Sequence, residues 1–170
     1  MSRANVTDID SKMNQAYGLV DNRIRELQSA YPILANIQDS PWINSIKRAK
    51  SMEVNPRTVL FSGAAPCNNF MLILKGVIRI YQTAEDGREM TLYRVEAGDL
   101  CILSLNSMLQ NRAFNAIAET ETDVVALVMS AEDFMAAING SETFRTYVLS
   151  TLTERLAETM YLLQGTAFNH

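Results

Sequence analysis

Residues 57–103 read RTVLFSGAAPCNNFMLILKGVIRIYQTAEDGREMTLYRVEAGDLCIL, and this stretch decides the fold. Short apolar runs alternate in it with turn signals such as Ser62-Gly63, Lys75-Gly76 and Asp86-Gly87. Strands of about 4 to 8 residues at a spacing of about 8 to 12 residues, with glycine between them, are typical of a β-sandwich or barrel. The strands predicted from these runs are 59–61, 70–74, 77–81, 90–95 and 100–103.

Two further strands and a helical N-terminal region complete the predicted barrel domain. The strands lie at 113–118 and 124–129, and a loop or short helix is expected over 104–111 before them. Before the barrel, Ser40 is placed to cap a helix whose first position suits Pro41. The region before the barrel is therefore predicted to form short helices.

Two helices are predicted after the last strand. Ser130 is placed to cap the first of them, and Asn139-Gly140 is its predicted stop. Ser141 caps the second, which is expected to run over 142–164 and to end at Gly165. At about 1.5 Å per residue this last helix is about 35 Å long, which exceeds a small barrel.

The last helix carries an apolar face that a small barrel cannot cover along its whole length. A two-fold related copy of the same helix is the economical partner, so we predict a homodimer. The alternative, that the helix packs only along its own domain, stays open. The predicted dimer-interface residues are Phe144, Val148, Leu152, Leu156, Met160 and Leu163.

The composition describes an ordinary globular protein. The chain has 170 residues, of which 48% are hydrophobic and 20% charged, and its net charge of −4 gives no basic surface for nucleic acid. The N-terminus lacks the apolar core of a signal peptide and no run of 18 apolar residues exists, so we expect a cytoplasmic protein. The expected division is a flexible N-terminus (1–18), a barrel domain with N-terminal helices (19–140), a dimerisation helix (141–165) and a tail (166–170).

Several kinds of catalytic or cofactor site lack their residues. The only histidine is His170, so a metal-dependent cupin has no ligands and a serine or cysteine nucleophile has no internal base. Cys67 and Cys101 form no Cys-x-x-Cys pair and are too few for an iron–sulfur cluster. Haem would need an axial ligand, which Cys101 or a methionine could supply. Most of the methionines, however, lie at the spacing of core residues. We therefore expect no enzyme, no metal and no cofactor.

Three segments resemble a known family. They are Val59-Leu60-Phe61 with Gly63, the run from Phe70 through Gly76 to Tyr81, and the run from Gly87 through Leu92-Tyr93-Arg94-Val95 to Gly98-Asp99. Together with the long last helix, they are similar to the cyclic-nucleotide-binding-like sensor domain of Crp/Fnr transcription regulators, over about residues 20–164. The resemblance implies a mainly β fold with flanking helices: a double-stranded β-helix (jelly-roll) barrel, N-terminal helices and a long C-terminal dimerisation helix.

The resemblance fails where the family binds its nucleotide. Cyclic-nucleotide binders of the family carry a Gly-Glu pair shortly after the turn that Gly98-Asp99 matches, and an Arg followed by a small residue later. Backbone N–H groups and the Arg meet the phosphate, while the Glu takes the ribose hydroxyl. Here the stretch reads Cys101-Ile102-Leu103-Ser104-Leu105, and Arg112-Ala113 lies off register. The effector is thus not expected to be an ordinary cyclic nucleotide.

The favoured hypothesis is an effector-sensing, dimerising domain of a Crp/Fnr-like regulator. Its partners would be a second copy and an unknown small molecule, with DNA bound only through a winged-helix domain that follows in the family and is absent from this chain, which stops at His170. The alternative is a stand-alone, ligandless interaction module. The predicted ligand-binding residues are Phe70, Leu72, Leu92, Arg94, Gly98, Asp99, Cys101, Leu103, Arg112 and Phe114.

Overall fold

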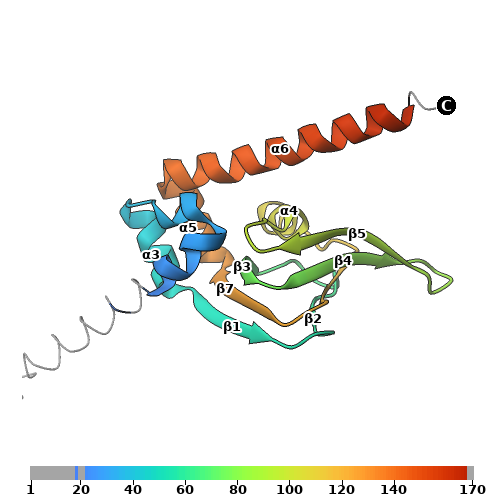
Figure 1. Cartoon of the computed structure of the whole chain (residues 1–170), viewed down its shortest axis with the longest axis horizontal. Coiled ribbons are helices and arrows are strands. Elements are labelled where there is room, and N and C mark those ends of the chain that lie inside the picture. Colours follow the sequence, from blue (N-terminus) through green and yellow to red (C-terminus); the bar gives the residue numbers. More distant parts are fainter. Residues whose placement is uncertain (1–17, 19–21, 168–170) are drawn as a thin grey trace, which may run out of the picture.

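The computed structural model describes residue 18 and residues 22–167, with side chains placed as far as residue 165. The flexible N-terminus predicted for 1–18 and the tail predicted for 166–170 lie almost wholly outside the described residues. Figure 1 shows two β-sheets with helices grouped at one end and one long helix passing over α4 and β5.

Two antiparallel sheets form the barrel. The three-stranded sheet has the order β1-β7-β3, and the four-stranded sheet has the order β2-β6-β4-β5. The strands are β1 (Lys50–Val54), β2 (Val59–Phe61), β3 (Asn69–Lys75), β4 (Val77–Thr83), β5 (Glu89–Glu96), β6 (Ile117–Thr120) and β7 (Val124–Ser130). The predicted mainly β barrel with flanking helices and a long last helix is confirmed.

The inner faces of the two sheets enclose an apolar layer, because alternate residues of each strand point to the same side. β3 and β4 contribute Ile73, Ile78 and Ile80, while β5 and β6 contribute Val95 and Ala118, all buried. Gly76 turns the chain from β3 into β4 with a φ of +96°, a conformation that favours glycine.

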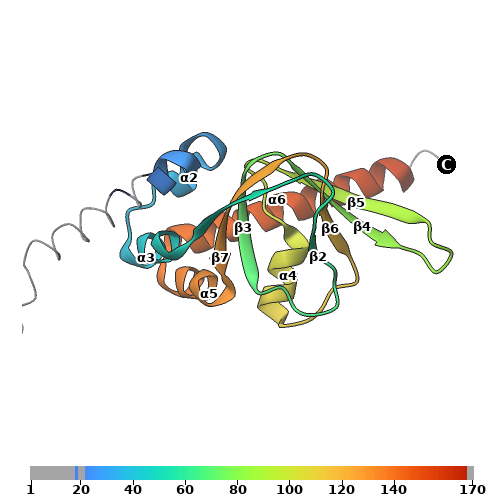
Figure 2. The ribbon, with the colours of Figure 1, turned by 90° about the horizontal axis from the view of Figure 1, so that it is seen from below.

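Short helices cover the outer face of β3 and β7. Residues 22–30 are helical, followed by α2 (Pro32–Ala35) and α3 (Ser40–Arg48), and α5 (Ala131–Gly140) joins them from the other end of the chain. Figure 2 shows α2, α3 and α5 grouped on the side of β3 and β7. This packing makes a second core with a cluster of four aromatic rings: Trp42, Phe70, Phe134 and Phe144.

Three parts of the predicted secondary structure were wrong. The strand predicted at 100–103 is two residues without regular structure followed by the start of α4 (Ile102–Gln110), since a short apolar run suits a buried helix as well as a strand. The strand predicted over 113–118 begins only at Ile117. β1 was missed because it reads Lys-Ser-Met-Glu-Val and lies at a sheet edge, where only alternate side chains are partly covered.

The helix ends follow the predicted caps in two of three cases. Ser130 Oγ accepts a hydrogen bond from Asp133 N, and Ser141 Oγ accepts one from Phe144 N, each at 3.1 Å. At the start of α3 the cap is Asp39, not the predicted Ser40. The last helix, α6 (Glu142–Ala167), continues past Gly165, which is not among the glycines with the positive φ that ends many helices.

Candidate functional site

A cavity of about 510 Å³ lies between the two sheets. Small-molecule sites usually occupy about 300 to 1,000 Å³, so the cavity is large enough for a ligand. Inward side chains of β3 to β6 make one part of its wall, among them Met71, Ile73, Ile80, Val95 and Ala118. The barrel interior is thus partly filled by its own side chains and partly open.

The loop over residues 62–69 forms another wall of the cavity. Gly63 has a φ of +72°, and a Cβ there would lie 2.2 Å from Phe114 O, so the loop can approach the β6 segment only with glycine at this position. Cys67 N donates a hydrogen bond to Ser107 Oγ at 2.8 Å, which ties the loop to α4. These contacts fix the loop across the barrel.

A small polar group stands at the start of α4. Tyr93 OH lies 3.5 Å from Cys101 Sγ, and Ser104 Oγ donates to the same sulfur at 3.1 Å. Leu103 N donates to Tyr93 OH at 3.1 Å. Burial, followed by the effect of Cys101, raises the pKa of the Tyr93 phenol above its ordinary value, so the phenol stays neutral. Cys101 and Ser104 belong to the cavity wall, so these hydrogen-bonding groups are close to any occupant.

The structure places four of the predicted ligand-binding residues on the wrong face of their strands. Phe70 and Leu72 are buried, but they pack in the helical core outside the barrel. Leu92 and Arg94 are exposed on the outer side of β5. A one-residue error in strand alternation exchanges the two faces, and the cavity is lined instead by the intervening residues of β3 and β5, such as Met71 and Val95.

Of the remaining predicted residues, Cys101 lines the cavity. Leu103 and Phe114 pack against the barrel core without belonging to the cavity wall. Arg112 is exposed. The Gly98-Asp99 turn lies outside the cavity, in a crevice beside α6. The residues of the loop 62–69 were not among the predicted ligand-binding residues, although the Ser-Gly pair at its start marked a turn between two strands.

The Gly98-Asp99 turn joins three parts of the chain. The Asp99 carboxylate accepts hydrogen bonds from Glu96 N and from Arg155 Nη2 of α6, each at 3.0 Å. Tyr31 OH donates to Asp99 O at 2.7 Å and accepts from Ile73 N at 2.8 Å. Burial is the largest cause of the raised pKa of Tyr31, which therefore remains a neutral donor. The turn thus contacts β3, the N-terminal helical region and α6.

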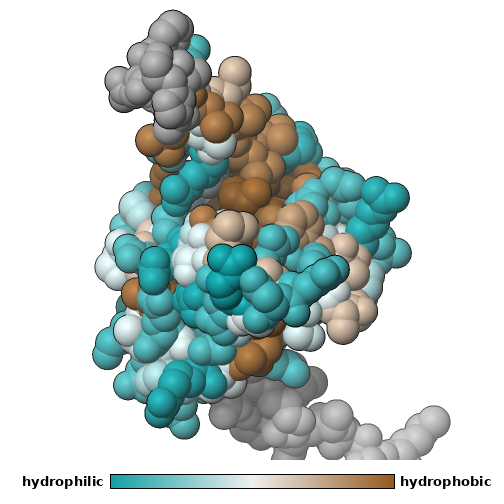
Figure 3. Space-filling view, turned by 90° about the vertical axis from the view of Figure 1, so that its right-hand side faces the viewer, coloured by the Kyte–Doolittle hydropathy of each residue, from teal (hydrophilic) through white to brown (hydrophobic). Residues whose placement is uncertain are grey.

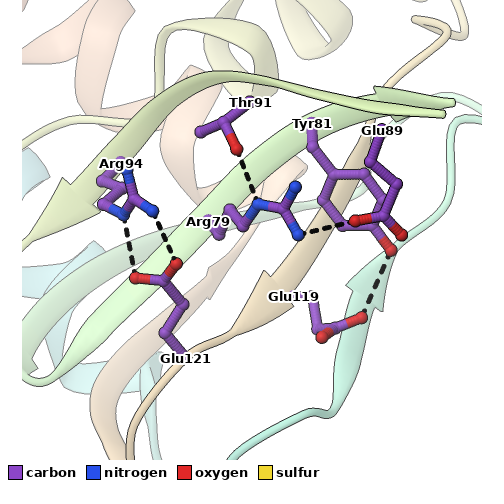
Figure 4. Close-up of polar contacts among 7 residues, drawn as sticks. All are labelled: Arg79, Tyr81, Glu89, Thr91, Arg94, Glu119 and Glu121. Carbon is purple, nitrogen blue, oxygen red and sulfur yellow. Dashed lines mark hydrogen bonds and ion pairs between the residues drawn. The ribbon is translucent and has the colours of Figure 1, made fainter.

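The arginine side chains of β4 and β5 point away from the cavity. Figure 4 shows Arg79 on the outer face of the four-stranded sheet, where its Nη1 lies 2.8 Å from Glu89 Oε2 and its Nε donates to Thr91 Oγ1 at 2.7 Å. Its guanidinium also covers the Tyr81 ring at 4.4 Å, and Tyr81 OH donates to Glu119 Oε2 at 3.2 Å. These contacts keep Arg79 on the outside.

Arg94 is held on the same outer face. Its Nε and Nη2 donate to the two carboxylate oxygens of Glu121, both at 2.9 Å (Figure 4). The hydrogen bond from Arg94 is the main reason that the pKa of Glu121 lies below its ordinary value. A two-pronged pair of this kind fixes the guanidinium plane, so Arg94 is turned away from the barrel interior.

The predicted dimer residues divide into two groups. Phe144 and Val148 are buried within their own chain, and Leu152 packs partly against the same core, so the first two are corrected to core residues. The exposed ones are Leu156 (61%), Met160 (57%) and Leu163 (63%).

Leu149 is 56% exposed and belongs to the same helix, although it was not among the predicted interface residues. Its spacing of seven residues from Leu156 was the signal that could have found it. Figure 3, seen from the end at which α6 terminates, shows hydrophobic residues gathered on the surface there. The second half of α6 therefore carries apolar side chains that its own domain leaves uncovered.

The described residues provide neither a metal site nor a membrane span. Among residue 18 and residues 22–167, no group of three or more His, Cys, Asp or Glu side chains is placed to hold a metal ion. Within the same part of the chain, no helix is both long and apolar enough to cross a membrane.

Residues 51–141, more than half of the chain, match the family model of the cyclic nucleotide-binding domain. Comparison with curated proteins gave no match. Among solved structures, a protein described as a transcriptional regulator of the crp/fnr family from Eubacterium rectale has a TM-score of 0.68 and 22% identity, over 83% of this chain and 65% of that one. This chain therefore spans about two thirds of that protein's length.

Two further structures are similar. The sensor domain of the transcriptional regulator DNR from Pseudomonas aeruginosa has a TM-score of 0.66 and 14% identity, over 83% of this chain and 93% of that domain. The catabolite activator protein of Thermus thermophilus has a TM-score of 0.65 and 20% identity, over 81% of this chain and 63% of that one. At these identities the likeness is one of fold, and it confirms the predicted resemblance to the sensor domain of Crp/Fnr regulators.

Proposed function

This chain belongs to the cyclic nucleotide-binding domain family, and from that premise we propose that it is the effector-sensing and dimerising domain of a Crp/Fnr-like transcription regulator. A small molecule binds in the cavity between the sheets, and α6 pairs with α6 of a second copy. The domain acts by binding and not by catalysis. A ligand that prefers one arrangement of the two chains shifts the dimer toward it.

The observation that carries the proposal is the division of α6. One face of its first half is buried against its own core, whereas every described side chain from 153 to 165 is exposed. Apolar residues continue through the exposed half at steps of three and four, the spacing by which two helices form a coiled coil. The positions in the exposed half are Leu156, Met160 and Leu163, and the same spacing begins before it at Leu149 and Leu152.

The arginine positions support an effector other than an ordinary cyclic nucleotide. Arg79 and Arg94 are paired with carboxylates on the outside of the barrel, and Arg112 is exposed. A cyclic phosphate in the cavity would lack the guanidinium that usually neutralises it. Together with the missing Gly-Glu pair, this argues against the nucleotide.

DNA binding requires a further unit in this proposal. The part of the chain covered by the structure contains no winged-helix domain. The net charge of −4 gives the chain itself no basic surface for DNA. The domain would act on DNA only through a winged-helix unit connected to it.

A stand-alone, ligandless module is the second candidate considered. In that case the barrel would be filled by its own side chains and dimerisation would be the whole activity. The open volume of about 510 Å³ weighs against it. The two candidates predict the same dimer and differ in ligand binding.

Light scattering on a sizing column tests the dimer. The wild-type chain is expected to have twice the mass of one chain, and Leu156→Glu, which puts a charge in the seam, is expected to have the mass of one. Ser150→Glu adds the same charge to an exposed position off the seam and should remain dimeric. A monomeric wild type at tens of micromolar, or a dimeric Leu156→Glu, would refute the interface.

A thermal-shift screen tests the effector. Ligands that bind only the folded state raise the melting temperature. We expect no shift with cyclic AMP or cyclic GMP at millimolar concentration, because the cavity has no phosphate partner. A clear shift with either nucleotide would overturn that part of the proposal, while the dimer measurement would be unaffected.

A further inference from the structure

The chemistry of the cavity wall narrows the class of ligand. Among the described residues, none of the side chains that line the cavity carries a charge. The strands supply aliphatic and methionine side chains, such as Met71, Ile78 and Val128, and both cysteines of the chain also reach the wall. A ligand enclosed by these groups contacts mostly carbon and sulfur atoms.

A charged ligand in the cavity would have no group of opposite charge beside it. Burying an isolated ion without a partner of opposite charge is strongly unfavourable. The arginines of the surrounding sheet cannot serve without breaking their own pairs, since Arg79 bonds Glu89 and Thr91 while Arg94 holds Glu121 by two hydrogen bonds. The barrel therefore selects against ions of either sign.

The polar groups of the wall are few and neutral. The loop 62–69 supplies Ser62, Asn68 and Asn69, and α4 supplies Ser104 beside the Cys101 thiol. In the described structure the amide side chains of Asn68 and Asn69 make no hydrogen bond within the chain, so they can donate to and accept from an occupant. Apolar walls with a few placed polar groups are typical of sites for largely apolar molecules.

We infer that the cavity binds an uncharged, mainly apolar small molecule that carries a hydroxyl, carbonyl or amide group. The apolar body lies between the two sheets, and the polar group meets the loop 62–69 or the start of α4. This inference rests on the proposed function, in which the cavity is the effector site, and it adds the chemical class of the effector.

Three naphthalene compounds of nearly equal size test the class by calorimetry on the whole chain. They are 1-naphthaleneacetamide, which is neutral, 1-naphthaleneacetate, an anion, and 2-(1-naphthyl)ethylamine, a cation. The amide is expected to bind at least about tenfold more tightly than either ion, because only the ions must be buried without a counter-charge. Cyclic AMP serves as the family's own ligand and should not bind.

A cavity-filling variant, a matched control and a replacement variant locate the binding. Ala118→Phe fills the cavity from the four-stranded sheet, and it should abolish binding of the amide. Glu119→Phe places the same ring at the next position, which faces the outer side of β6, and it should bind the amide like the wild type. Val128→Phe, from the opposite sheet, replaces Ala118→Phe if circular dichroism shows that the first variant is unfolded.

The outcomes separate the inference from the proposed function. Equal or tighter binding of the carboxylate, the amine or cyclic AMP, lost in Ala118→Phe, would overturn the neutral class and keep the cavity as the effector site. Amide binding that survives Ala118→Phe, or Val128→Phe where that variant replaces it, would place the compound elsewhere and overturn the inference. If no compound binds to the wild type, the inference is overturned, while the thermal-shift screen and the dimer measurement still test the proposed function.

Discussion

The two sheets of the barrel differ in what covers their outer faces. In the three-stranded sheet, β3 and β7 are covered on both sides, because they face the cavity on one side and the aromatic core of the helices on the other. The four-stranded sheet carries exposed ion pairs on its outer side, where Arg79 and Arg94 meet Glu89 and Glu121. The three-stranded sheet therefore contributes more to the stability of the fold, whereas substitutions on the outer face of the four-stranded sheet should change the free energy of unfolding little.

The largest loss of stability is expected from a substitution on the helix-covered face of the three-stranded sheet. Phe70 is 1% exposed, and its ring centroid lies 4.7 Å from that of Phe134. Phe70→Ala should lower the free energy of unfolding by about 3 to 5 kcal/mol, since it removes a buried ring and leaves a cavity. Urea denaturation followed by circular dichroism measures this. Thr91→Ala, on the open face of the other sheet, is the control, and a similar loss in both variants would remove the difference between the sheets.

The second largest loss of stability is expected in the connection between the two sheets. Gly76 joins β3 to β4 with a φ of +96°, and a Cβ there would lie 2.1 Å from Asp123 O. Gly76→Ala should cost about 3 kcal/mol, from backbone strain and from displacement of the neighbouring turn. Gly87 has a φ of +83° with nothing near its Cβ position, so Gly87→Ala should cost only about 1 kcal/mol. Equal melting temperatures for the two variants would contradict the role of the close approach.

Tyr31 provides a smaller link between the sheets. Its hydroxyl accepts from Ile73 N on β3 and donates to Asp99 O after β5. Tyr31→Phe should cost about 1 to 3 kcal/mol, because a buried amide loses its partner. Hydrogen exchange at the Ile73 amide should become faster relative to the rest of β3. An unchanged exchange rate there would mean that another group replaces the hydroxyl.

The outer face of the four-stranded sheet should tolerate substitution. Arg79 contacts Glu89, Thr91 and the Tyr81 ring, but the Glu89 side chain is 45% exposed. Arg79→Ala should therefore cost about 1 kcal/mol or less by denaturant unfolding. A loss as large as that of Phe70→Ala would show that this face contributes to the core.

The smallest effect concerns pH. Arg94 keeps the pKa of Glu121 below its ordinary value of 4.5, so the pair stabilises the fold above about that pH and loses its effect as the pH falls through the lowered pKa. The melting temperature of Arg94→Gln should be slightly below that of the wild type at pH 7, and the difference should disappear as the pH falls through the lowered pKa of Glu121. A difference that persists at acid pH would assign the effect to packing.

The difference between the two sheets also explains for which strands the inward face could be predicted from the sequence. In β5, the polar residues Arg94 and Glu96 alternate with Tyr93 and Val95, so the inward face could have been read from the pattern. In β3 the run Phe70 to Leu74 is apolar throughout, because both faces are buried. No alternation exists there, and only the tertiary structure shows that Met71 and Ile73 face the cavity.

The candidate site was harder to predict than the fold. Strand lengths and glycine turns depend on local sequence, and they predicted the barrel. The cavity depends on how the loop 62–69 and the start of α4 lie across it, and the run at 100–103 was assigned to a strand although Ile102 begins a helix. Of the predicted residues, Cys101 is the one on the cavity wall.

The position of Arg155 has a mechanical consequence for α6. Up to Leu152 the helix is held by the domain core, and the Arg155–Asp99 pair is the last ion pair between α6 and the barrel in the described structure. Beyond it α6 continues for about 18 Å, from residue 156 to residue 167, with its described side chains exposed. A tilt of about 10° at the Arg155–Asp99 pair would move the far end by about 3 Å. In the proposed dimer, a small displacement at the barrel would therefore become a larger one where the two α6 helices pair.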